Sequence, residues 1–244
     1  MALWATCYLS GRVDVDTAVG RATPDADHAQ GARTWLETWH SLGERVVLVA
    51  LPRPGDYGDL PRGGDLRDAA LAAGECVFVP GLGGGLVPAV EGYGPPGDRG
   101  LAVRWTHDDS DPVPPHVLDA WSLRETQRAL DDAVRRATDS LEGGPTPWAS
   151  RGLADEAGAR LDAGSWGLPT GLAPRAARLI ATAGAIGDLA RFARSAPADG
   201  TGAASIERRA RALRELSAAA DTALSRAVNV AALHLAGLRP GRDD

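Results

Sequence analysis

The segment Gly81-Leu82-Gly83-Gly84-Gly85 is the part of the chain that most suggests a phosphate-binding loop. A dinucleotide-binding fingerprint needs G-x-G-x-x-G at the start of a helix, so that amides and the helix dipole face the pyrophosphate. Here Leu86 stands where the third glycine is required, and Pro88 follows within an extended apolar run. We therefore predict a flexible connection, in which Gly83 and Gly84 would let a ligand or another chain approach the backbone closely.

Two arginine–aspartate pairs follow the first two apolar runs of the chain. If those runs are parallel strands, both pairs lie beyond the carboxyl ends of the strands, where open α/β sheets bind their ligands. A guanidinium at that place could hold an anionic group through two hydrogen bonds. Such pairs also lock turns, so a purely structural role is the alternative. The candidate ligand-binding residues are Arg12, Asp14, Arg53 and Asp56.

The densest cluster of possible metal ligands is His107-Asp108-Asp109-Ser110-Asp111, with His116 close by. Oxygen-rich sites of this kind suit magnesium, manganese or calcium. Consecutive acids ahead of three prolines are, however, typical of a solvated linker, and the glycine and terminal glutamate of a calcium loop are missing. We predict no metal site here, and we expect a chelator to leave the melting temperature unchanged.

The segment 205–235 is predicted to be a long helix with a seam of small residues at alternating steps of four and three. This heptad spacing, with small side chains, lets helices approach closely. Leu213 and Leu224 are the largest side chains on the seam, which either packs inside a helical bundle or joins two chains. Acidic residues interrupt the arginines of its first half, and the net charge of the chain is −6, so the sequence does not favour nucleic-acid binding.

Composition excludes several enzyme classes. All 26 basic residues are arginines, so no Schiff-base lysine, Walker-A lysine or kinase lysine exists. The nucleophile elbow G-x-S-x-G of esterases is absent as well. Cys7 and Cys76 cannot form a C-x-x-C pair or a tetrathiolate zinc site, and each is predicted to be buried. No cofactor is predicted.

The order of the predicted elements indicates an α/β region followed by helices. A strand–helix–strand unit at the start implies two adjacent parallel strands with a right-handed crossover. Turns rich in proline, glycine and aspartate follow, and the glycine segment connects two further strands as a hairpin or as a strand and an edge strand. The predicted strands are residues 3–9, 45–51, 75–79, 86–90 and 101–106, and the predicted helices are residues 27–42, 66–73, 115–141, 153–161, 174–194 and 205–235.

The fold class predicted is therefore an α/β domain with a βαβ-containing sheet over residues 1–112, followed by an all-α helical bundle over residues 113–244. Charge divides in a similar way. Residues 1–150 hold 13 arginines against 22 acidic residues, net −9, whereas residues 151–244 hold 13 against 10, net +3. This asymmetry favours docking of the two halves on each other, or an acidic partner for the helical half.

The function predicted is that of a non-enzymatic cytoplasmic protein that acts by self-association or by binding a protein partner. A protein or enzyme that binds an anionic small molecule at Arg12, Arg53 and Asp56 is the alternative. The first residues show no basic region ahead of an apolar run, and no apolar run reaches the length of a membrane span, so the cytoplasm is the expected location.

Overall fold

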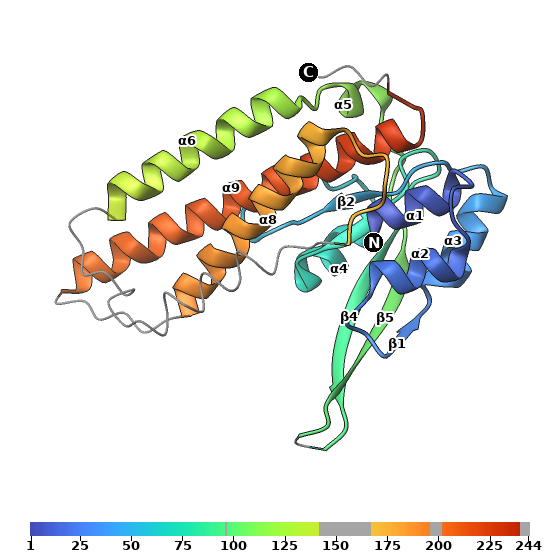
Figure 1. Cartoon of the computed structure of the whole chain (residues 1–244), viewed down its shortest axis with the longest axis horizontal. Coiled ribbons are helices and arrows are strands. Elements are labelled where there is room, and N and C mark those ends of the chain that lie inside the picture. The colour runs from blue at the N-terminus through green and yellow to red at the C-terminus, as the bar shows by residue number, and fades with distance from the viewer. Residues whose placement is uncertain (96, 142–166, 196–201, 240–244) are drawn as a thin grey trace. The chain divides into compact units, whose positions relative to one another are not determined.

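The computed structural model describes residues 1–95, 97–141, 167–195 and 202–239, and it divides into two compact units (Figure 1). Among the described residues, the first unit comprises residues 1–121, 167–173 and 228–239, and the second comprises residues 122–141, 174–195 and 202–227. The predicted fold class, an α/β region followed by helices, is confirmed. The units divide after Trp121, whereas the sequence places the boundary at residue 112.

A mixed five-stranded sheet forms the centre of the first unit, with strand order β1-β5-β4-β3-β2. β1 runs parallel to β5, and every other neighbouring pair is antiparallel, which includes the predicted connection of β3 to β4 through the glycine segment. The strands are β1 (His28–Gln30), β2 (Leu48–Ala50), β3 (Cys76–Phe78), β4 (Gly85–Tyr93) and β5 (Gly100–Asp108).

Helices lie against both faces of this sheet. Leu86 belongs to a buried cluster with Ala5 of α1 (Ala2–Leu9) and Leu36 of α3 (Ala32–Ser41), and α2 (Val15–Ala22) contributes Val15 and Val19 to its edge. Gly85, which faces the opposite way because side chains alternate along a strand, lies against Leu66 of α4 (Leu66–Ala73). The sheet is thus the middle layer of three.

The predicted strand over residues 3–9 is wrong, because these residues form the helix α1. The segment is apolar on all sides and is buried on most of them, so its periodicity could not separate a buried strand from a buried helix. The predicted parallel pair with residues 45–51 is therefore also wrong. Residues 48–50 of that run form β2, which pairs antiparallel with β3.

The predicted helix over residues 27–42 is a helix only from Ala32, because residues 28–30 form the strand β1 and Gly31 separates the two. That glycine has a φ of 84°, and a side chain there would overlap the carbonyl of Trp105, so only glycine fits between β1 and α3. The predicted helix over residues 115–141 is two helices, α5 (Pro115–Asp119) and α6 (Leu123–Leu141).

The second unit, as far as it is described, consists of long helices. The predicted helices at 174–194 and 205–235 are confirmed as α8 (Pro174–Ser195) and α9 (Ala203–Leu235), and the residues of α9 from Val228 onward belong to the first unit. The predicted helix at residues 153–161 lies outside the described residues. The buried residues of α6 recur at alternating steps of three and four, a spacing typical of helix packing through a narrow seam, and they are Leu123, Thr126, Leu130, Ala133 and Ala137.

Candidate functional site

Arg12 and Asp14, two predicted ligand-binding residues, each stabilise the end of a helix. The Arg12 guanidinium donates a hydrogen bond from Nη2 to the carbonyl oxygen of Leu235, at 2.9 Å, and so caps the end of α9. The Asp14 carboxylate accepts from the backbone N–H and the hydroxyl of Thr17, at 2.8 and 2.9 Å, and so caps the start of α2. These hydrogen bonds hold the pKa of Asp14 below its usual value.

Arg53 and Asp56 are brought together, in one turn after β2. Their backbones exchange hydrogen bonds in both directions, at 2.8 and 2.9 Å. Arg53 Nη2 lies 3.6 Å from Asp56 Oδ2. The Asp56 carboxylate therefore competes with any external anion for the positive charge of the Arg53 guanidinium.

The glycine segment is held by side chains from elsewhere in the first unit. The Glu44 carboxylate accepts a hydrogen bond from the backbone N–H of Leu82, at 2.5 Å, and the Ser110 hydroxyl oxygen accepts from the N–H of Gly84, at 2.9 Å. Gly83 and Gly84 have φ values of 81° and 76°, and the carbonyl of Ser110 lies where a side chain at Gly83 would be. Amides that a phosphate would need are thus already bound to protein oxygens.

Glu44 itself is buried, with an exposed fraction of 8%. Removal from water raises the pKa of Glu44 above its usual range, and the N–H groups of Leu82 and Gly81 oppose that shift. The carboxylate therefore occupies the place of an anion in a cradle of backbone amides. Because it comes from the same chain, it gives the segment a fixed shape.

His107 of the acidic cluster packs against an aromatic side chain. Its ring stacks on Trp35 with centroids 3.7 Å apart and an angle of 11° between the planes, and its Nδ1 lies 3.9 Å from Asp109 Oδ1. The backbone of the cluster is also held, because Asp109 O accepts from the N–H of Leu66 and Asp111 N–H donates to Arg62 O. Among the described residues, no group of three histidine, cysteine or acidic side chains is arranged to hold a metal.

Asn229 and Thr6 have roles that the sequence analysis did not identify. Asn229, fully buried, accepts from the N–H of Val49 through Oδ1, at 2.8 Å, and donates through Nδ2 to the Val49 carbonyl, at 2.9 Å. The Thr6 hydroxyl pairs in the same way with the N–H and carbonyl of Val47. Two side chains thus form hydrogen bonds with the backbone N–H and carbonyl groups at the β2 edge of the sheet, where a further strand would otherwise bind.

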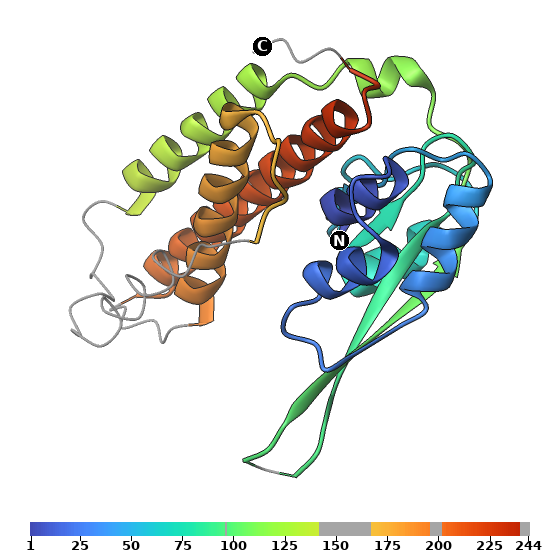
Figure 2. The ribbon, with the colours of Figure 1, turned by 45° about the vertical axis from the view of Figure 1, so that its right-hand side comes forward.

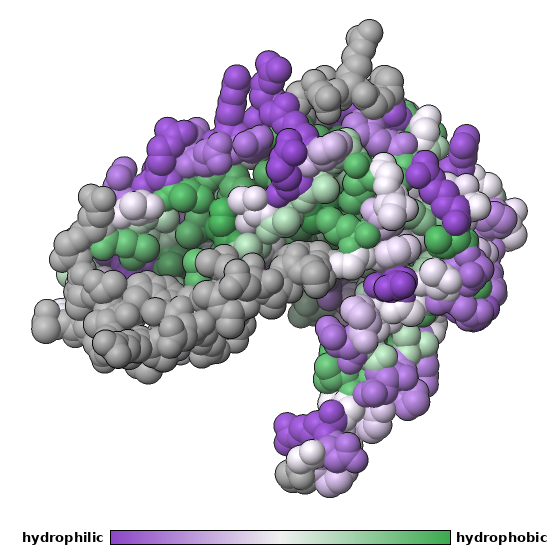
Figure 3. All heavy atoms as spheres, in the orientation of Figure 1, coloured by the Kyte–Doolittle hydropathy of each residue, from purple (hydrophilic) through white to green (hydrophobic). Residues whose placement is uncertain are grey.

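The outer half of the β4–β5 hairpin stands clear of the helices of its unit (Figure 2). Residues of β4 are buried from Gly85 to Pro88 and exposed from Ala89 to Tyr93. Val90, Tyr93 and Leu101 are 60%, 42% and 41% exposed there. Figure 3 shows hydrophobic atoms on this part of the hairpin, whereas most of its tip is polar. Because side chains alternate along a strand, Val90 and Leu101 lie on one face of the hairpin and Tyr93 lies on the other. Exposed apolar side chains are therefore available to a partner on either face.

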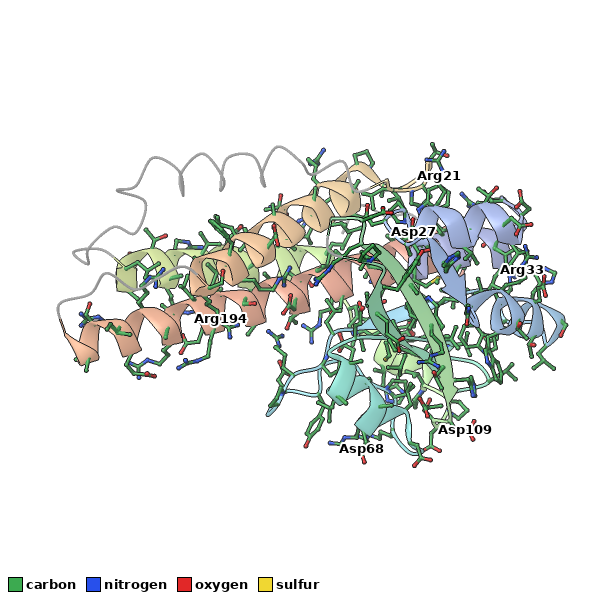
Figure 4. The ribbon with its side chains drawn as sticks, turned by 90° about the horizontal axis from the view of Figure 1, so that it is seen from below. Arg21, Asp27, Arg33, Asp68, Asp109 and Arg194 are labelled. Atoms are coloured by element: carbon green, nitrogen blue, oxygen red, sulfur yellow. The ribbon has the colours of Figure 1, made fainter. Side chains whose placement is uncertain are left out.

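Asp27 holds the outer end of β5 in this projection. Its backbone N–H and its carboxylate bond to the carbonyl and the N–H of Leu101, each at 2.9 Å, and the ring of His28 stacks on Tyr93. Figure 4 shows Asp27 beside the long strands and Asp109 at their other end, directed outward. The projecting hairpin is therefore held in a defined direction relative to β1.

We expect the Tyr93 hydroxyl to titrate above the usual range of tyrosine. Partial removal from water, then the negative charge of Asp27 and its hydrogen bond, raise the pKa of Tyr93. Asp27→Asn removes that charge and should lower the pKa, as followed by absorbance of the phenolate during a pH titration. Tyr93→Phe identifies the transition that belongs to Tyr93. An unchanged titration in Asp27→Asn would contradict this geometry.

Both thiols are expected to be inert in the native protein. Cys7 and Cys76 are free and buried, and burial raises the pKa of both, that of Cys76 to about 12. A thiolate is the reactive species, so Ellman's reagent should label neither residue near neutral pH until guanidinium chloride unfolds the chain. Rapid labelling of a folded sample would show that one thiol is accessible.

The two residues predicted to mediate association lie on α9 in the second unit. Leu213 is buried, at 5% exposed, and Leu224 is half-buried. Ala220 and Ala227 of the same seam are buried as well. A single chain thus covers most of this seam.

Within the part of the chain that the structure describes, none of the helices combines the length and the apolar character that a membrane span requires.

Comparison with known proteins finds relatives in mycobacteria. Proteins of two Mycobacterium tuberculosis strains, both named uncharacterized protein (MT1533 and Rv1486c), are 32% identical over 162 residues, which cover 58% of this chain and 55% of the relative. An uncharacterized protein of Mycobacterium avium, MAV321, is 29% identical over 185 residues, covering 58% of this chain and 59% of that protein. The chain thus spans little more than half the length of these relatives. No solved structure matches.

Two domain families match successive parts of the chain. Residues 1–121 match the family described as Rv1486c-like protein, N-terminal domain, and residues 124–225 match Rv1486c-like protein, C-terminal domain. The junction between these matches coincides with the division between the two units of the structure after Trp121. The chain is therefore similar to the Rv1486c-like proteins in both of its domains.

Proposed function

We propose that the chain is a non-enzymatic cytoplasmic protein that acts by binding protein, and that the outer half of the β4–β5 hairpin is its contact surface. The observation that carries this proposal is the exposure of Val90 and Leu101 on one face of the projecting strands, with Tyr93 exposed on the opposite face. Burial of such side chains against a partner removes apolar area from water, which favours association. The position of the hairpin is fixed in advance by Asp27, so little ordering is needed on binding.

The use of the other candidate residues within the fold supports the same proposal. Arg12 and Asp14 cap helices, Arg53 is engaged by Asp56, and the N–H of Gly84 is bound to Ser110. Each of these groups would have to break a hydrogen bond or an ion pair within its own chain before it could bind a small molecule. Two free, buried cysteines fit a reducing compartment and so support a cytoplasmic location.

Site-specific photocrosslinking in living cells tests this surface. Val90 and Leu42 are matched positions, at 60% and 61% exposed, and they lie on different parts of the first unit. Val90→p-benzoylphenylalanine should give discrete protein adducts on irradiation, and Leu42→p-benzoylphenylalanine should give none. Equal adducts at both positions, or no adducts at position 90, would contradict the proposal.

A further inference from the structure

The outer half of β4 borders a strand on one side only. Its nine residues pair with β5 from Gly85 to Tyr93, whereas β3 pairs only with Gly85 and Leu86. From Ala89 to Tyr93, no other strand of the described residues lies on the far side of β4. An unpaired strand edge is a template for another strand.

The alternation of backbone hydrogen bonds along β4 determines which backbone groups face this open edge. The N–H of Val79 donates to the carbonyl of Gly84, so even-numbered residues of this stretch direct their polar groups toward the β3 side. Pro88, which has no N–H, fits that side because it does not have to donate to β5. Val90 and Gly92 follow the same alternation, so each presents an N–H and a carbonyl to the open edge.

Strand pairing along this open edge is limited at both ends. Pro88 is buried at the inner end, and Gly94, with a φ of 91°, leaves the strand conformation at the outer end. A partner strand therefore has two residues to pair with, separated by Glu91. This short, bounded edge defines a narrow choice of register.

We infer that a second copy of the chain occupies this edge, with β4 antiparallel to β4 of the partner about a two-fold axis at Glu91; this inference rests on the proposed function. Val90 of each copy pairs with Gly92 of the partner subunit, and each pair exchanges both hydrogen bonds. The side chain of Val90 then lies beside a residue with no side chain. Pairing two residues further inward meets the buried Pro88, and two residues further outward reaches the end of the strand.

The charges on this edge are compatible with the two-fold arrangement. Each Glu91 carboxylate accepts a hydrogen bond from Nη2 of Arg104 on the same hairpin, at 2.8 Å. The two Glu91 side chains that meet at the axis therefore each bring a counter-charge. The paired segments are short, so the interface is small and the association weak and dependent on concentration.

Sedimentation equilibrium of the full chain, from micromolar to millimolar concentration, tests this pairing. Wild-type protein should pass from one chain to two. Gly92→Pro removes an outward N–H that β5 does not use, and it should lower the association constant at least tenfold while the circular dichroism stays unchanged. Gly92→Ala is the matched control: the only atom near an added Cβ is Gly100 O at 4.0 Å, so dimerisation should persist.

Amide hydrogen exchange of the wild-type protein provides a second measurement that needs no variant. The N–H groups of Val90 and Gly92 should exchange more slowly as the concentration rises, whereas exchange at Leu42 should not change. A monomer throughout the range, or dimerisation of Gly92→Pro as strong as that of wild type, would overturn the second-copy pairing. Crosslinks from position 90 to a different protein would then still support the proposed function, so the two failures are distinguishable.

Discussion

Asn229→Leu is expected to lower the free energy of unfolding by about 3 kcal/mol, because two buried backbone groups lose their hydrogen bonds at once. Leucine fits the volume of asparagine approximately but can neither accept from the Val49 N–H nor donate to its carbonyl. An unsatisfied buried polar group costs about 1–3 kcal/mol. The loss should also loosen the contact of the end of α9 with β2.

Urea denaturation followed by tryptophan fluorescence measures this effect. Thr38→Val is the matched control, because the Thr38 hydroxyl bonds only to Thr34 O one turn earlier in its own helix. That variant should stay within about 0.5 kcal/mol of wild type. If Asn229→Leu were as stable as Thr38→Val, the pairing of Asn229 with the edge of β2 would be refuted.

Glu44→Ala is expected to destabilise the protein by about 2 kcal/mol, because the amides of the glycine segment lose the carboxylate that they bind. Glu44→Gln keeps an oxygen that can accept from the Leu82 N–H and should recover most of that loss. The comparison separates the need for a hydrogen-bond acceptor from the need for a charge. Chemical denaturation of the three proteins under the same conditions gives both differences.

The pH dependence of this site has a defined sign. Burial raises the pKa of Glu44 in the folded state above the unfolded value of about 4.5, so the folded protein binds this proton more tightly. The contribution of Glu44 to the free energy of unfolding is fully present below the pKa of the unfolded state and is lost as the pH rises through the pKa of the folded state. Wild type should therefore lose stability relative to Glu44→Gln across that interval. A difference that stays constant with pH would show that Glu44 is not desolvated.

Long periodic segments could be predicted from the sequence, and so could the short helix α4, which ends at Gly74, whereas the uniformly apolar α1 and the three-residue β1 could not. α9 is long, so its alternating steps of four and three residues are repeated over many turns. α1 has only eight residues, with apolar side chains on every face, and the same composition suits a buried strand. β1 has three residues, and its pairing with β5 depends on a partner more than 70 positions away.

The roles of the candidate site residues depend still more on contacts with residues that are distant in the sequence. Arg12 is bound by Leu235 and the glycine segment by Glu44, and neither partner can be found from the local pattern. Asn229 did leave a signal: it is the only asparagine in the chain, and it stands between two valines in an alanine-rich helix. A lone polar residue on an apolar helix face requires a buried partner, although the sequence does not say which one.

Native mass spectrometry of freshly purified protein tests most directly whether the chain acts through protein contact, because it reads the assembly and any bound small molecule together. We expect a mixture of one and two chains without a small-molecule adduct, and a Gly92→Pro sample that contains single chains only. A stoichiometric small molecule on the single chain, retained in Gly92→Pro and lost in Arg53→Ala, would contradict a function through protein contact and assign the function to the turn of Arg53 and Asp56.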